Sequence, residues 1–146
     1  MLKKNHKKGF TLIEMLVVIA IIAVLVAVII PVVGNSTTRA KAAVDAANLR
    51  SVLGSLNSEI MLDYEAAEGY IAAMTPPDCK TFPGAKLQVV YQIPGLIDVY
   101  FVQDGKYYSK DYLGDIAANG TTDMEPNAST HGAEAVWFEV GKGKVS

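Results

Sequence analysis

The sequence reads Lys7-Lys8-Gly9-Phe10-Thr11-Leu12-Ile13-Glu14 where a short basic leader meets a long apolar segment. The leader holds four lysines in its first nine residues, and such a positive stretch stays on the cytoplasmic side of a membrane during insertion. The apolar segment covers the 24 residues from Phe10 to Val33, of which only Thr11 and Glu14 are polar. As a helix it extends about 36 Å, which is enough to cross a bilayer core about 30 Å thick.

Glu14 is the one acid within this apolar segment. A lone carboxylate at membrane depth costs roughly 2.5–3.5 kcal/mol on insertion scales, so it calls for a partner. An ordinary secretory signal is cut after its apolar core, but no suitable small-residue site follows the core here. A cut in front of the core, between Gly9 and Phe10, would instead create a cationic amine beside Glu14. The alternative is an interfacial carboxylate that reaches headgroup water.

The stretch from Lys8 to Glu14 resembles the class III signal of type IV pilins and pseudopilins. In that family a membrane aspartyl peptidase, the prepilin peptidase, cuts after the glycine and N-methylates the new N-terminal residue. The resemblance therefore implies cleavage between Gly9 and Phe10 and N-methylation of Phe10. Counted from Phe10, Glu14 is fifth and Pro31 is 22nd, which are the positions of the family's assembly glutamate and its helix-kinking proline.

The resemblance also implies roles for Glu14, Pro31 and Gly34. Glu14 of one subunit would pair with the Phe10 amine of a neighbour and set the register between subunits. Pro31 lacks a backbone donor and clashes with the preceding turn of a helix, and Gly34 follows it closely. We expect a kink or a melted turn near the membrane exit; the alternative is that Pro31 ends the spanning helix.

By this resemblance the chain is expected to be a structural subunit of a type IV pilus. Its partners would be prepilin peptidase, copies of itself in a helical filament, minor pilins, and the assembly platform with its motor. It would cross the cytoplasmic membrane once before assembly and lie in an extracellular filament afterwards. One alternative is a minor pilin, or a pseudopilin of type II secretion or DNA uptake. Another is a binding or enzymatic domain held by an uncleaved signal anchor.

Composition narrows the possible functions. The chain has 13 basic and 15 acidic side chains, and loss of the leader lysines leaves nine against fifteen. That balance, with no basic stripe or aromatic platform, argues against nucleic-acid binding by the monomer. Cys79 is the one cysteine, so an intrachain disulfide is impossible. The chain thereby departs from pilins that close a C-terminal loop with a disulfide.

The sequence predicts no enzyme, cofactor or metal site. After loss of the leader only His131 remains as a histidine, and no phosphate-binding glycine loop, zinc pattern or nucleophile elbow accompanies it. We interpret His131 as a loop residue. Asp115, Asp123 and Glu125 suggest calcium, but their spacing does not fit a calcium-binding loop, so we interpret them as solvated acids.

From Ser36 the pattern becomes that of an amphipathic helix. Apolar residues recur at helical spacing and predict one buried stripe: Val44, Leu49, Val52, Leu53, Leu56 and Ile60. Asp45 is among the polar residues expected on the remaining surface. We expect this helix to end near Asp63, and a second helical piece to cover Tyr64 to Met74.

After Thr75-Pro76-Pro77 the period changes to that of strands. Alternation predicts one strand over Leu87 to Ile93 and a second over Leu96 to Gln103. We favour a three-residue loop, Pro94 to Leu96, because it puts Ile97, Val99 and Phe101 on the same apolar face as Tyr91.

The C-terminal part predicts one more hairpin and one more strand. Asp104-Gly105 is a strong turn signal that leads into Lys106-Tyr107-Tyr108. The residues from Ala135 to Val140 are expected to form the last strand. The polar stretch from Gly114 to Gly132 between them is expected to be a surface loop that carries subunit contacts or ligand specificity.

The expected fold class is therefore α+β, the type IV pilin fold. A long kinked N-terminal helix would pack its second half on a small antiparallel sheet of about four strands. The expected divisions are a cleaved leader at 1–9, a transmembrane and filament-core helix at 10–34, an amphipathic helical part at 35–74, and a β-rich head at 75–146.

Overall fold

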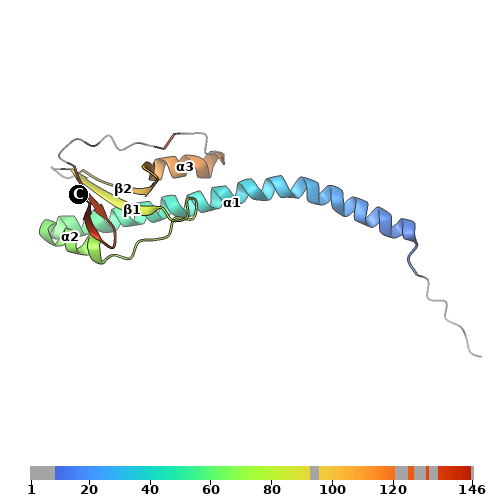
Figure 1. Cartoon of the computed structure of the whole chain (residues 1–146), viewed down its shortest axis with the longest axis horizontal. Coiled ribbons are helices and arrows are strands. Elements are labelled where there is room, and N and C mark those ends of the chain that lie inside the picture. The colour runs from blue at the N-terminus through green and yellow to red at the C-terminus, as the bar shows by residue number, and fades with distance from the viewer. Residues whose placement is uncertain (1–8, 93–95, 121–124, 127–130, 132–134, 146) are drawn as a thin grey trace, which may run out of the picture. The chain divides into compact units, whose positions relative to one another are not determined.

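The computed structural model describes residues 9–92, 96–120, 125, 126, 131 and 135–145 (Figure 1). The chain divides into two compact units, Met1–Asn35 and Ser36–Ser146. One helix, α1 (Leu12–Leu62), contributes to both units. The second unit, called the head below, also holds α2, α3 and a sheet. The fold is α+β, with a long N-terminal helix followed by an antiparallel sheet, and it is consistent with the pilin fold.

α1 continues without a break through Pro31 and Gly34. The alternative that Pro31 ends the helix is therefore wrong, and no turn of the helix is melted at this point. A proline inside a helix removes one backbone hydrogen bond but does not prevent the remaining ones from forming. The part of α1 in the first unit has a mean hydropathy of 3.5 over its most apolar window, none of it buried, and is long enough to cross a membrane.

In the head, α1 buries one stripe of small and aliphatic side chains. Its buried residues are Ala42, Asp45, Ala46, Leu49, Val52 and Leu56. The spacing of three and four residues places them on one face of the helix. Two assignments from the sequence were wrong: Val44 is 49% exposed, and Asp45 is fully buried. The buried face of α1 includes Asp45 because a loop donates hydrogen bonds to the Asp45 carboxylate.

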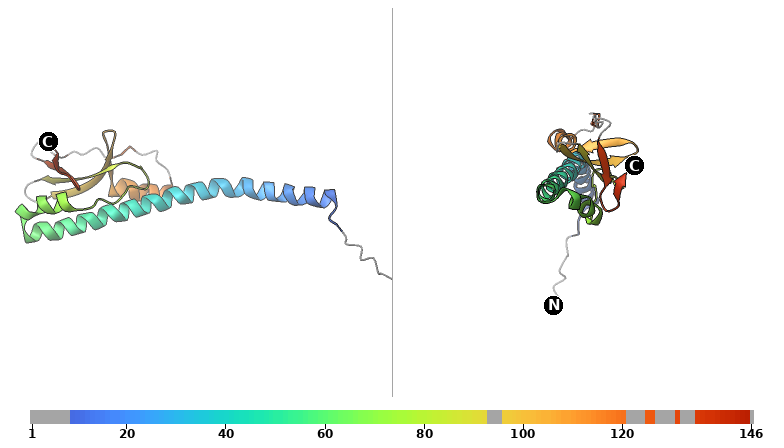
Figure 2. Two further views of the ribbon diagram at one scale, coloured as in Figure 1. Left: turned by 60° about the horizontal axis from the view of Figure 1, so that its bottom comes forward. Right: turned by 90° about the vertical axis from the view of Figure 1, so that its left-hand side faces the viewer.

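α2 (Tyr64–Ala73) confirms the second helical piece expected from the sequence. Asp63 caps its N-terminus, where its Oδ1 atom accepts hydrogen bonds from the backbone N–H of Glu65 at 3.0 Å and of Ala66 at 3.3 Å. α2 lies beside the C-terminal end of α1 (Figure 2). Its buried face, Ala67 and Ile71, contacts the sheet. The two helices therefore form a hairpin whose turn is Asp63.

The sheet has five antiparallel strands in the order β3-β2-β1-β4-β5. Their bounds are β1 Lys86–Gln92, β2 Leu96–Gln103, β3 Lys106–Ser109, β4 Val136–Glu139 and β5 Gly143–Val145. The strand expected over Ala135 to Val140 is β4, but it is not the last. β5 follows because Gly141 and Gly143 adopt φ angles of 85° and 109°, which glycine allows at low cost, and the chain turns back onto β4.

The pairing of β1 with β2 confirms the expected apolar face. Tyr91 lies opposite Ile97, Val89 opposite Val99, and Leu87 opposite Phe101. The loop was placed wrongly, however, because Gln92 already pairs with Leu96. Residues 93–95, between the two strands, lie outside the described residues. The next turn is as expected: Asp104 and Gly105 have φ angles of 52° and 75°, as a type I′ hairpin turn requires.

α3 (Lys110–Asn119) lies where a surface loop was expected from Gly114 onward. Ser109 caps its start by accepting a hydrogen bond from the backbone N–H of Tyr112 at 3.1 Å. Tyr112, Leu113 and Ile116 are buried in the core, and Gly120 ends the helix in the left-handed conformation. These caps and the apolar spacing outweigh the polar composition that suggested a loop. Asp123 and most other residues of the expected loop after Gly120 lie outside the described part of the chain.

Candidate processing and assembly site

The junction between Gly9 and Phe10 precedes α1 and has no regular secondary structure. Both residues are exposed, and 80% of the Phe10 surface is accessible. A peptidase must bind the peptide bond that it cuts in an extended form, which a helix does not provide. The geometry therefore leaves the Gly9–Phe10 bond open to cleavage.

Thr11 and Glu14 form a reciprocal cap at the start of α1. The backbone N–H of Thr11 donates to Glu14 Oε2 at 3.1 Å, and the backbone N–H of Glu14 donates to Thr11 Oγ1 at 3.3 Å. This arrangement is a capping box, which satisfies two of the donors left free at a helix start. The spacing Thr-x-x-Glu, which is the sequence signature of a capping box, is present at Thr11 and Glu14.

The capping box places the Glu14 carboxylate beside the backbone N–H of Thr11, which is the first residue after Phe10. Its acceptor atom bonds to the N–H of Thr11, which is the peptide group that links Phe10 to Thr11. An amine created at Phe10 would thus begin one residue from the group that the carboxylate already binds. Glu14 is exposed, so it is also accessible to an amine from another chain.

The first part of α1 presents apolar side chains on all sides. From Leu12 to Val33 its large apolar residues are between 43% and 85% exposed. Monomeric soluble proteins rarely expose apolar surface of this extent, which indicates a membrane or a protein partner. Among the described residues, α1 is also the helix with the length and composition for a membrane span. Pro31 and Gly34 lie within this surface near its C-terminal end.

Asp45 ties the loop after α2 to the buried face of α1. Its carboxylate accepts hydrogen bonds from the backbone N–H of Lys80 at 2.8 Å and of Thr81 at 2.6 Å, and from the Cys79 thiol at 3.4 Å. Cys79 is free and buried. Burial, and to a smaller extent the charge of Asp45, raises the pKa of the Cys79 thiol to about 12. The thiol thus stays protonated at neutral pH and acts as a donor rather than a nucleophile.

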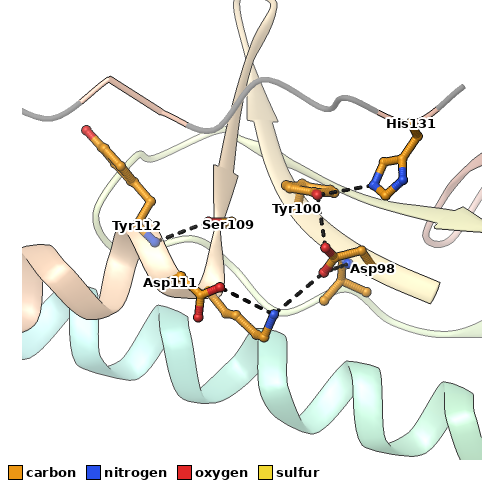
Figure 3. A network of polar contacts seen from close by, with 8 residues as sticks. Asp98, Tyr100, Ser109, Asp111, Tyr112 and His131 are labelled. Atoms are coloured by element: carbon orange, nitrogen blue, oxygen red, sulfur yellow. Dashed lines mark hydrogen bonds and ion pairs between the residues drawn. The ribbon is translucent and has the colours of Figure 1, made fainter. Parts of the chain in front are cut away.

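A second polar cluster joins β2 to the segment that contains His131 (Figure 3). Tyr100 donates its hydroxyl proton to Asp98 Oδ2 at 2.9 Å, and the Tyr100 oxygen lies 3.3 Å from His131 Nε2. Because that proton goes to Asp98, His131 must be the donor in the second bond. Lys110 Nζ lies 3.9 Å from Asp98 and 3.7 Å from Asp111. His131 is thus a loop residue, as expected, and it is anchored to the sheet.

This cluster is a fixed structural contact. Burial and the hydrogen bond to Asp98 raise the pKa of Tyr100, so its hydroxyl remains protonated at neutral pH. The Tyr100 ring lies against Tyr107 and Trp137, with centroid distances of 6.0 Å to each. Over the part of the chain that the structure describes, no three His, Cys, Asp or Glu side chains lie close enough together to hold a metal ion. Asp115 belongs to α3, and Asp123 lies outside the described residues.

The comparisons with known proteins agree with the N-terminal geometry. Residues 4–30 match the family model of the prokaryotic N-terminal methylation motif. The chain therefore carries the type IV prepilin signal. No curated protein and no solved structure matches the chain.

This motif supports a type IV pilin or a pseudopilin. It implies processing by prepilin peptidase and pilus assembly. Together with the long apolar helix it suggests a membrane-anchored pilin. The family is a structural one and is not known for catalysis.

Proposed function

We propose that this chain is a structural subunit of a type IV pilus. Prepilin peptidase cuts it between Gly9 and Phe10 and methylates the Phe10 amine. The apolar part of α1 holds the subunit in the membrane until it moves into a helical filament made of further copies. The observation that carries the proposal is the prepilin signal at residues 4–30, joined to a helix whose apolar surface is uncovered over its first part.

The transfer from membrane to filament is supported by the physics of that surface. Side chains that lie in lipid before assembly can pack against those of neighbouring subunits afterwards, since both surroundings are apolar. Glu14 is the exception, because a carboxylate in an apolar surrounding needs a partner. We propose that the Phe10 amine of a neighbouring subunit is this partner. The work of extraction comes from the assembly platform and its motor, and minor pilins join the same filament.

Mass spectrometry of filaments sheared from cells tests the proposal. The chain is expressed as the main subunit, and the N-terminal peptide of the sheared protein is sequenced. We expect a first residue of N-methylphenylalanine at position 10. An intact leader at residues 1–9 on the exported protein would mean an uncleaved anchor and would exclude the pilin function. When the chain is expressed at its natural level instead, its abundance in sheared filaments distinguishes a major from a minor subunit.

Substitution of Glu14 tests the charge pairing separately from the helix cap. Glutamine can take the place of glutamate in a capping box, so Glu14→Gln keeps the start of α1 but removes the charge. We expect this variant to be inserted and cut normally but to yield at least about tenfold less filament, because each subunit contact loses its charge pair.

Thr11→Ala is the matched control, because it removes the cap acceptor and keeps the charge. We expect it to assemble nearly as well as the unmodified chain. Immunoblots of the sheared and cell-bound fractions measure both variants. Normal filament yield from Glu14→Gln as the sole major subunit would contradict the pairing, although not the processing.

A further inference from the structure

A groove about 690 Å³ in volume opens on the head beside α1. It is bounded by Lys41 of α1, by the segment from Pro76 to Leu87, and by the turn between β4 and β5. Four lysines line it: Lys41, Lys80, Lys86 and Lys142. Between them, the walls are formed by Pro76, Pro77, Pro83 and Ala85, with Leu87 and Val140 behind. The groove therefore combines apolar walls with a basic rim.

The groove keeps a positive charge after its internal ion pairs are counted. Glu139 lies 2.9 Å from Lys142 and 3.7 Å from Lys86, and Asp78 lies 3.7 Å from Lys80. Lys41 has no ion pair with any residue that the structure describes. Four lysines against these two acids leave a charge of +2, although the whole chain is negative. Such a local excess attracts an acidic partner.

The turn between α1 and α2 combines exposed apolar side chains with negatively charged ones, which is the complement of the groove. Met61 and Leu62 are 89% and 81% exposed. Four acids flank them: Glu59, Asp63, Glu65 and Glu68. The sequence contains no lysine or arginine between Arg50 and Lys80, and none of these four acids forms an ion pair within the described part of the chain. We call this apolar pair with its flanking acids the acidic knob.

One molecule cannot place its knob in its own groove. Met61 lies 20 residues beyond Lys41 in the same continuous helix, which separates them by about 30 Å. Both features belong to the head, so this separation does not depend on the first unit. If the two surfaces meet, they must belong to different molecules.

We propose that the acidic knob of one subunit docks in the basic groove of another. Met61 and Leu62 lie between the proline walls, and Glu65 and Glu68 face Lys41 and Lys80. This inference rests on the proposed pilin function and names a contact between the heads of neighbouring subunits. Because the two surfaces differ, the contact is heterologous, and its repetition without closure gives an open fibre.

Charge reversal with rescue tests the contact. Lys41→Glu together with Lys80→Glu places like charges against the knob, and like charges at an interface oppose binding strongly. We expect at least about tenfold less sheared filament, with leader cleavage unchanged. Glu65→Lys together with Glu68→Lys should have the same effect. All four changes in one chain should restore the filament, which a misfolded head could not do.

Lys106→Glu together with Lys144→Glu is the matched control. It reverses two exposed lysines that do not line the groove, and we expect normal filaments. Normal filaments from the groove variant, or no rescue in the fourfold variant, would overturn the contact. Normal filaments that lost bound DNA would assign the groove to nucleic acid and would also overturn it.

Disulfide trapping gives an independent measurement. Leu62→Cys and Lys80→Cys are made in separate copies that also carry Cys79→Ser, because the native thiol lines the groove. The two copies are expressed together in the same cells. We expect an oxidised dimer in filaments only when both variants are present, and none when Leu62→Cys is combined with Lys106→Cys. Absence of the dimer in processed, assembled filaments overturns the contact but leaves the proposed function intact. If the unmodified chain is not processed or does not assemble, both proposals fail.

Discussion

Asp45 is a carboxylate with no exposed surface, held by three donors from a single loop. Isolated buried charges are costly, but hydrogen bonds to the charged form offset that cost. The donors come from Cys79, Lys80 and Thr81, 34 to 36 residues later in the chain. No local pattern around Asp45 encodes them, which is why helical periodicity assigned this residue to the surface. The same loop supplies one wall of the basic groove, so Asp45 also fixes the shape of that groove.

Asp45→Ala is expected to destabilise the head by roughly 1–3 kcal/mol for each of the two part-buried backbone N–H groups that lose their acceptor. Asp45→Asn keeps one acceptor oxygen and should cost about 1–3 kcal/mol. Urea denaturation of the full chain in detergent micelles measures both changes. Equal losses for the two variants would show that the hydrogen bonds to this side chain are not what holds the loop.

Cys79 is expected to make the head less stable in alkali. The unfolded thiol ionises from a pKa of about 9, while the folded thiol keeps its proton up to about 12. Below pH 9 the thiol is protonated in both states, and its contribution to stability is constant. Between pH 9 and about 12 the unfolded state loses a proton that the folded state retains, so the free energy of unfolding falls by about 1.4 kcal/mol per pH unit.

Cys79→Ser keeps a donor for Asp45 but has no group that ionises in this range. Urea titrations from pH 8 to pH 11 should therefore show a weaker fall for Cys79→Ser than for the unmodified chain. Some fall will remain, because burial also raises the pKa of Tyr100, Tyr108 and Tyr112. Identical slopes for the two proteins would contradict the thiol's contribution.

At the scale of elements, α3 shows how caps can define a helix in a polar sequence. Its start at Ser109 and its end at Gly120 have the residue types that favour helix termini. Arg39 of α1 donates a hydrogen bond to the carbonyl of Asn119 at 3.1 Å, which satisfies a free acceptor at the C-terminal end. The cap at Gly120 therefore also joins α3 to α1.

Gly120→Ala is expected to destabilise the head by about 1–2 kcal/mol. Gly120 has a φ angle of 73°, which disfavours side chains by about this amount, and an added Cβ would lie 2.6 Å from Arg39 Nε. Gly114→Ala is the matched control within the same helix. Its Cβ would meet the nearest atom, on Arg50, at an ordinary 3.7 Å, so it should stabilise by roughly 0.5–1 kcal/mol through helix propensity. Thermal unfolding measures whether each variant is more or less stable than the unmodified chain. A more stable Gly120→Ala variant would contradict the role of Gly120 as the helix cap.

For the whole molecule, most of what the sequence predicted depends on residues close in the chain, although two local elements, α3 and β5, were missed. The prepilin signal, α1, α2 and the faces of β1 and β2 depend on residues close in sequence, and each was predicted. β5 was missed because its pairing with β4 depends on the glycines at 141 and 143. The groove and Asp45 were missed because they need α1, the loop after α2 and the β4–β5 turn together. The acidic knob could have been found from the absence of basic residues between Arg50 and Lys80.

The distribution of charge in the head gives the proposed fibre a direction. Each joint uses the knob of one subunit and the groove of another, so a finished fibre has an unoccupied knob at one end and an unoccupied groove at the other. One terminus is acidic and the other basic, and a subunit added at either terminus meets only one of the two surfaces. The polarity of the fibre is then a property of the subunit itself, because an arriving head fits at either terminus in one orientation only.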